Sequence, residues 1–126
     1  MAGPVREVAQ LTNHYRAKFG LPPLQISTTL EYVAQSHGDD MGRNGYFSHV
    51  GRDGSDIGDR AQRGGYRYCV IAENIAMGHR SPRAVIRGWI DSPGHRANLL
   101  DHEVAEIGVT RGRGDIWVMV LGNRQC

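Results

Sequence analysis

The chain has 126 residues and a formal net charge of +2, from 15 Lys and Arg against 13 Asp and Glu. Its length suits one domain with a single core, and 40% hydrophobic with 22% charged residues excludes a disordered chain. The arginines are dispersed rather than clustered, which argues against a nucleic acid partner, and no stretch approaches the about 18 apolar residues of a membrane span. We therefore expect a monomeric single domain over residues 1–126, with no transmembrane segment.

Apolar residues at helical spacing predict a first helix over residues 5–19. A second helix is predicted to begin with Thr28 or Thr29 as its cap and to end near residues 42–45. His37 falls on the apolar stripe of this helix, so we expect it to be a hydrogen-bonded core residue.

Ser55 is predicted to cap a short helix over residues 56–63. Residues 66–77 mix aromatic and β-branched side chains and predict a strand. Pro82 stands at a favourable first helical position and predicts a helix that reaches about Ser92.

The last part of the chain reads as two strands, over residues 105–110 and 116–121, joined by a glycine-rich turn at 112–115. Helices gathered early and strands gathered late indicate an α+β domain. We expect a mostly antiparallel sheet covered by helices.

Cys69 and Cys126 form an even pair, and we expect a disulfide between them. Such a bond persists only in an oxidising compartment; the alternative is two free thiols in a reducing one. The start of the chain, residues 1–4, has neither the basic nor the apolar part of a signal peptide, so we expect that an export signal has been removed.

Polar side chains concentrate in three segments, Y-F-S-H at 46–49, A-E-N-I at 72–75 and W-I-D-S-P-G-H-R-A-N-L at 89–99. The last matches W-x-x-S-P-G-H-R-x-N-L, the pattern of the bacterial branch of the CAP superfamily. This superfamily comprises the cysteine-rich secretory proteins, antigen 5 and the pathogenesis-related proteins, and its module is also called the SCP domain. The chain resembles it in all three segments, in the same order.

The resemblance extends beyond these segments. It includes Asn13 and Arg16 in the first predicted helix and E-I-G-V at 106–109. It therefore spans almost the whole chain and implies one CAP domain, built as a three-layer α-β-α sandwich.

The resemblance also implies a polar cleft with two histidines and two acids, in which the imidazoles bind zinc or another divalent cation. The matching residues are His49, His95 and Glu73. The second acid departs from the family pattern, because Ser92 stands where other members have glutamate and Asp91 is the adjacent carboxylate. These five residues are the expected ligand-binding site, with His49 and His95 as the metal ligands.

Three functions remain open at this point. The favoured one is a secreted or periplasmic domain whose cleft binds an extracellular small molecule, lipid, sterol or envelope component, and not an enzyme. The second is a metal-assisted hydrolase of peptide or cell-envelope material, with Glu73 as general base. The third is a purely structural interaction module.

Overall fold

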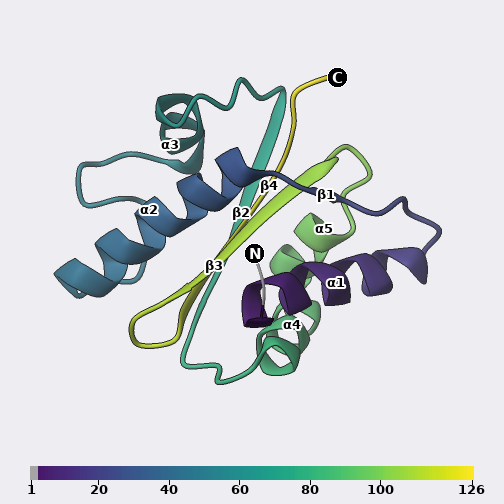
Figure 1. Ribbon diagram of the computed structural model, residues 1–126, viewed down its shortest axis with the longest axis horizontal. Helices are drawn as coiled ribbons and strands as arrows, with labels where there is room; N and C mark the ends of the chain where they lie inside the picture. Colours follow the sequence, from purple (N-terminus) through teal and green to yellow (C-terminus); the bar gives the residue numbers. More distant parts are fainter. Residues whose placement is uncertain (1–2) are drawn as a thin grey trace.

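The computed structural model describes residues 3–126, so Met1 and Ala2, on which the expectation of a removed signal partly rests, lie outside the described residues. In chain order the elements are α1 (Gly3–Ala17), β1 (Gln25–Ile26), α2 (Thr28–Asn44), α3 (Ile57–Arg63), β2 (Val70–Met77), α4 (Pro82–Ile90), α5 (Pro93–Leu99), β3 (Glu106–Gly112) and β4 (Ile116–Asn123). Figure 1 shows the strands crossing the middle of the molecule with helices on both sides.

The four strands form one sheet in the order β1-β3-β4-β2. β1 pairs in parallel with β3, whereas the β3–β4 and β4–β2 pairs are antiparallel. The sheet is thus mostly antiparallel, as predicted, and β2 lies at one end of the strand order with one edge free.

Side chains of β4 point alternately to the two faces of the sheet, because successive residues of a strand face opposite ways. One set packs with α1, α4 and α5: Trp117, Met119 and Leu121. The other set packs with α2 and α3: Ile116, Val118 and Val120. Two apolar cores therefore lie on either side of one sheet, which makes the three-layer α-β-α sandwich that the sequence predicted.

The predicted helix caps were wrong by one residue at two helices. Ser27, not Thr28 or Thr29, caps α2, and its hydroxyl accepts a hydrogen bond from the amide of Leu30. Asp56 rather than Ser55 caps α3, because its carboxylate and that of Asp59 exchange hydrogen bonds with each other's backbone amides.

The predicted elements also differ from the observed ones at several other boundaries. The first helix runs from Gly3 to Ala17, and β2 begins at Val70, where its pairing with β4 begins, so that the fully buried Tyr66 lies before the strand. α4 ends at Ile90, and Ser92 starts the separate short helix α5, which the sequence analysis did not predict. The two-residue strand β1 was also missed, and both hairpin strands end two residues beyond the predicted ends.

A disulfide joins Cys69 and Cys126, which confirms the predicted pair. It attaches the end of the chain to the residue before β2, and in Figure 1 the C-terminus lies near the start of that strand.

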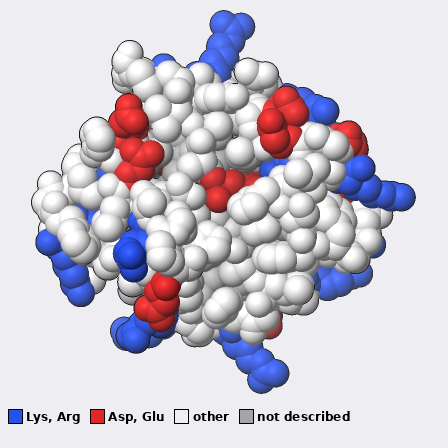
Figure 2. All heavy atoms as spheres, turned by 180° about the vertical axis from the view of Figure 1, so that it is seen from behind, with Lys and Arg blue, Asp and Glu red and all other residues white. Residues whose placement is uncertain are grey.

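None of the helices over residues 3–126 is both long and apolar enough to cross a membrane. The basic side chains project from many separate points of the face seen in Figure 2, whereas some acidic atoms lie in a central hollow of that face.

Candidate functional site

His49 lies in the loop that follows α2. The helix ends at Gly45, whose φ of 67° lets the chain turn away from the helix axis. His37, buried on α2, has Nε2 2.7 Å from the carbonyl oxygen of Ser48. Because a carbonyl only accepts, Nε2 carries the proton and donates. The prediction of a hydrogen-bonded core histidine is confirmed. The bond from His37 to Ser48 holds the loop at the residue before His49.

Glu73 lies in β2 with its side chain only 1% exposed. Nη2 of Arg60 lies 3.1 Å from Oε1 and 2.9 Å from Oε2, so one nitrogen contacts both carboxylate oxygens. Nδ1 of His49 lies 2.8 Å from Oε1. Because an ionised carboxylate only accepts hydrogen bonds, Nδ1 of His49 is the donor, and Nε2 is left free on a side chain that is 54% exposed.

Arg60 is the functional residue that the sequence analysis missed. It belongs to α3, its side chain is 9% exposed, and Nη1 donates to the carbonyl oxygen of Ser55 at 2.8 Å. Arg63, in the same last turn, turns outward instead and pairs with Asp53 at 2.5 Å. The sequence carries no signal that separates the two arginines, because only the position of β2 beside α3 decides which one meets Glu73.

The other half of the site comes from α4 and α5. Nε1 of Trp89 donates to the carbonyl oxygen of Ile75 at 3.2 Å. Nδ2 of Asn74 donates to the carbonyl oxygen of His95 at 3.1 Å, and Nδ2 of Asn98 donates to Oδ1 of Asn74 at 2.9 Å. These bonds hold α5 against β2 and fix the backbone of His95, so Asn74 and Asn98 are supporting residues.

Glu73 and Asn74 are consecutive in β2, so their side chains point to opposite faces of the sheet. Glu73 reaches His49 in the layer of α2 and α3, whereas Asn74 reaches His95 in the layer of α4 and α5. Both histidines are therefore tied to β2, one on each face of the sheet. We call His49, Glu73, His95 and Arg60 the edge cluster.

The two histidines of the edge cluster have opposite pKa shifts. The hydrogen bond to Glu73 raises the pKa of His49 above its ordinary value of 6.5. Burial lowers the pKa of His95 below that value, and the nearby His49 lowers it further. The imidazoles are therefore close enough to influence each other, and His49 holds a proton more firmly than His95 does.

Asp91 and Ser92 lie at the junction of α4 and α5. Asp91 is exposed at the C-terminal cap of α4, and Ser92 is the N-terminal cap of α5, where its hydroxyl makes no capping hydrogen bond. Within residues 3–126, no hydrogen bond or ion pair joins either of them to the edge cluster. Their role in ligand binding stays a prediction.

The side chains of the edge cluster do not form a zinc site with three protein ligands. Over the described part of the chain, no group of three or more His, Cys, Asp or Glu side chains is placed to hold a metal ion. Glu73 is already engaged by Arg60 and His49, which leaves two imidazoles as donors. Since catalytic zinc takes three protein ligands, the residues present do not fit such a centre, and no metal-assisted step is derived from them.

The fold and the edge cluster together define a cysteine-rich secretory protein module. A model of the cysteine-rich secretory protein family, CAP, matches residues 9–121, and the chain belongs to this family.

Two relatives come from Bacillus subtilis. The uncharacterized protein YkwD is 38% identical over 113 residues, which cover 89% of this chain and 44% of YkwD. The uncharacterized membrane protein YlbC is 36% identical over 104 residues, covering 82% of this chain and 30% of YlbC. The chain thus spans less than half the length of these relatives.

Two solved structures share the whole fold. An extracellular SCP-domain protein from Bacillus anthracis matches with a TM-score of 0.92 and 34% identity, over 96% of this chain and 40% of that one. An outer surface protein from Borrelia burgdorferi matches with a TM-score of 0.89 and 26% identity, over 95% of this chain and 92% of that one.

Proposed function

We propose that this chain is a secreted CAP domain that binds an extracellular ligand, a small molecule, lipid or envelope component, through the imidazoles of His49 and His95. The observation that carries the proposal is the engagement of the Glu73 carboxylate by both Arg60 and His49. A carboxylate held in this way orients the His49 ring and leaves its Nε2 free for a ligand.

The same contacts favour binding over hydrolysis. A general base must reach the proton that it removes, and Glu73 is 1% exposed and paired with the Arg60 guanidinium. Ser92 stands in place of the second acid of the family pattern, and within residues 3–126 no hydrogen bond or ion pair joins Asp91 to the edge cluster. We therefore place hydrolase activity second, and zinc bound by His49 and His95 stays a prediction.

The secreted location is supported by two independent observations. The disulfide between Cys69 and Cys126 suits an oxidising compartment. The matching proteins of Bacillus anthracis and Borrelia burgdorferi are described as extracellular and outer-surface proteins. Both agree with a domain that meets its ligand outside the cytoplasm.

The test is co-sedimentation with purified bacterial sacculi and, separately, with phosphatidylglycerol vesicles. We expect the protein to sediment with one of these, and the double variant His49→Ala/His95→Ala to lose at least about 90% of that binding because both imidazoles are gone. The matched control is His14→Ala/His102→Ala, since both side chains are exposed away from the edge cluster. Sedimentation with neither material, or equal sedimentation of all three proteins, would leave a structural module as the better account.

A further inference from the structure

A groove of about 620 Å³ lies between α2, α3 and the loop that joins them. It adjoins the edge cluster, since Arg60 and His37 form part of its wall, but its lining does not include His49, Glu73 or His95. Its volume falls in the range of small-molecule sites. The groove is therefore large enough for a small ligand, and it is separate from the two imidazoles of the proposed function.

The charged side chains of the groove already have partners. Asp53 pairs with Arg63 at 2.5 Å, and Arg60 pairs with Glu73. Asp40 accepts hydrogen bonds from the Tyr46 hydroxyl and from Asn44. A charged ligand would have to displace one of these partners, so the groove favours a neutral one.

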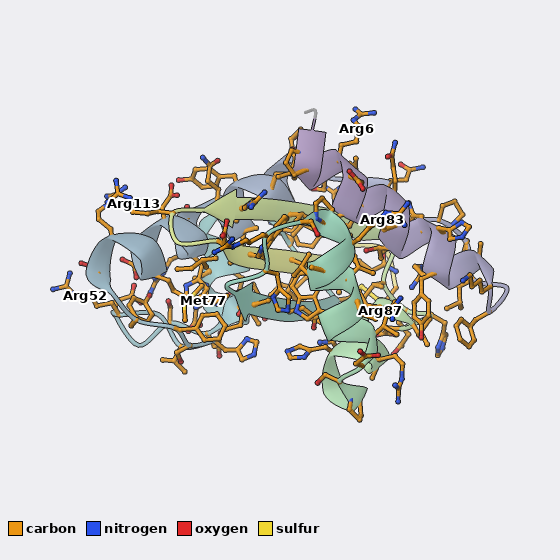
Figure 3. The ribbon with its side chains drawn as sticks, turned by 90° about the horizontal axis from the view of Figure 1, so that it is seen from below. Arg6, Arg52, Met77, Arg83, Arg87 and Arg113 are labelled. Atoms are coloured by element: carbon orange, nitrogen blue, oxygen red, sulfur yellow. A yellow bond between two sulfur atoms is a disulfide. The ribbon has the colours of Figure 1, made fainter. Side chains whose placement is uncertain are left out.

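Arg52 is a further charged residue of the lining, and it is also engaged. Its Nη1 donates to Oδ1 of Asn44 at 2.7 Å. In Figure 3 its side chain extends outward from the body of the protein.

The wall of the groove holds one buried acceptor and one buried donor without partners. His37 donates through Nε2, so its Nδ1 can only accept, and Nε of Arg60 can only donate; neither atom has a hydrogen-bond partner within residues 3–126. A hydroxyl group can donate to Nδ1 and accept from Nε, which neither a carboxylate nor an ammonium group can do. Both atoms are buried, so a small movement of the wall must accompany this contact.

The rim adds an aromatic surface and a hydroxyl. Tyr32 is 62% exposed, and Ser36 lies one helical turn further along α2 with its side chain exposed. Aromatic rings stack against the apolar faces of ring-shaped ligands, while hydroxyl and amide groups set their orientation. The lining thus combines neutral hydrogen-bonding groups with a flat apolar platform.

We propose that the groove formed by Tyr32, Ser36, His37 and Arg60 binds a neutral oligosaccharide. One sugar ring packs on Tyr32, and hydroxyl groups of the chain meet Ser36 and the unpaired atoms of the wall. The site is independent of the imidazoles of His49 and His95, so either proposal can fail without the other.

The test uses chitotetraose, maltotetraose and xylotetraose, three neutral tetrasaccharides of different linkage, titrated into isotopically labelled protein and followed by amide chemical shifts. We expect at least one to bind and to shift signals of residues 32–40 and 51–55. Ser36→Trp fills the groove and should weaken that binding at least about tenfold, whereas Gln35→Trp, on the neighbouring exposed position of α2, should not.

A second pair of variants tests the aromatic platform. Tyr32→Ala should weaken binding roughly fivefold, and Phe19→Ala, which removes a comparably exposed ring elsewhere, should leave it unchanged. His37 and Arg60 are kept because they also support the edge cluster. Absence of binding by all three sugars, or binding that Ser36→Trp leaves intact, would overturn the proposal; loss of binding in His49→Ala/His95→Ala would contradict the independence of the two sites.

Discussion

The two histidines of the edge cluster illustrate how neighbours set the chemistry of identical side chains. His49 donates to the buried carboxylate of Glu73, and this bond favours the protonated imidazole and raises the pKa of His49. Burial and the neighbouring His49 favour the neutral imidazole of His95 and lower its pKa. At a pH near 6.5, the proton is therefore favoured on His49 over His95.

This difference is measurable by following the imidazole Cε1–H signals during a pH titration. We expect His49 to have a pKa above 6.5 and His95 a pKa below it. His49→Gln should raise the pKa of His95, because a positive neighbour is removed. Equal values in the wild type, or no change of His95 in the variant, would contradict the proximity of the rings.

The same shifts give the sign of each histidine's own contribution to the pH dependence of stability. The raised pKa of His49 means that its contribution is fully present below 6.5 and is lost as pH rises through the pKa of the folded state. The lowered pKa of His95 has the opposite effect, and stability is lost as pH falls from 6.5 through that pKa.

Among the elements, the packing of α2 on the sheet depends on a glycine. Gly108 of β3 faces the start of α2, and a Cβ atom there would collide with backbone atoms of Leu30 and Glu31. Backbone atoms of a helix cannot yield as a flexible side chain can. The close approach of α2 to β3 places the following loop, and with it His49, beside β2.

Gly108→Ala should therefore lower the free energy of unfolding by at least about 2 kcal/mol, because α2 must move away from the sheet. Gly112→Ala is the matched control in the same strand, since the nearest atom to its new Cβ would be 3.9 Å away. We expect that variant to change the free energy of unfolding by less than about 1 kcal/mol. Urea denaturation measures both, and similar losses in the two variants would refute the steric explanation.

At the scale of the whole molecule, the disulfide is the one covalent link between distant parts of the described chain. It joins residues 57 positions apart and holds the end of the chain, after β4, against the start of β2. β2 is the strand that carries Glu73 and Asn74, and one of its edges is free. The link therefore stabilises the strand on which the edge cluster is built.

Replacing both cysteines, as Cys69→Ser/Cys126→Ser, should lower the free energy of unfolding by about 4 kcal/mol, from the greater freedom of the unfolded chain. Urea denaturation of the wild type with and without reductant should give the same loss, and the double variant should not respond to reductant. A loss below about 1 kcal/mol would mean that the bond constrains the unfolded chain little.

Local sequence patterns determined much of this protein. The apolar spacing of α1 and α2, the proline that opens α4 and the glycine-rich turn between β3 and β4 act within a few residues of the chain. The α+β class and the disulfide could therefore be predicted from the residues, and the three layers followed from the family resemblance. His49, Glu73 and His95 were found through the family pattern, because each lies in a short motif.

Only the tertiary structure decided which strands, helices and side chains contact one another. β1 has two residues and exists through its pairing with β3, and α5 is a single short helix held by Asn74 and Asn98. Arg60 and Arg63 are indistinguishable in the sequence, yet one is buried against Glu73 and the other is exposed on Asp53. The physical reason is that hydrogen bonds and ion pairs depend on distances between elements, which the packing of α3 against β2 sets and the local order of residues does not.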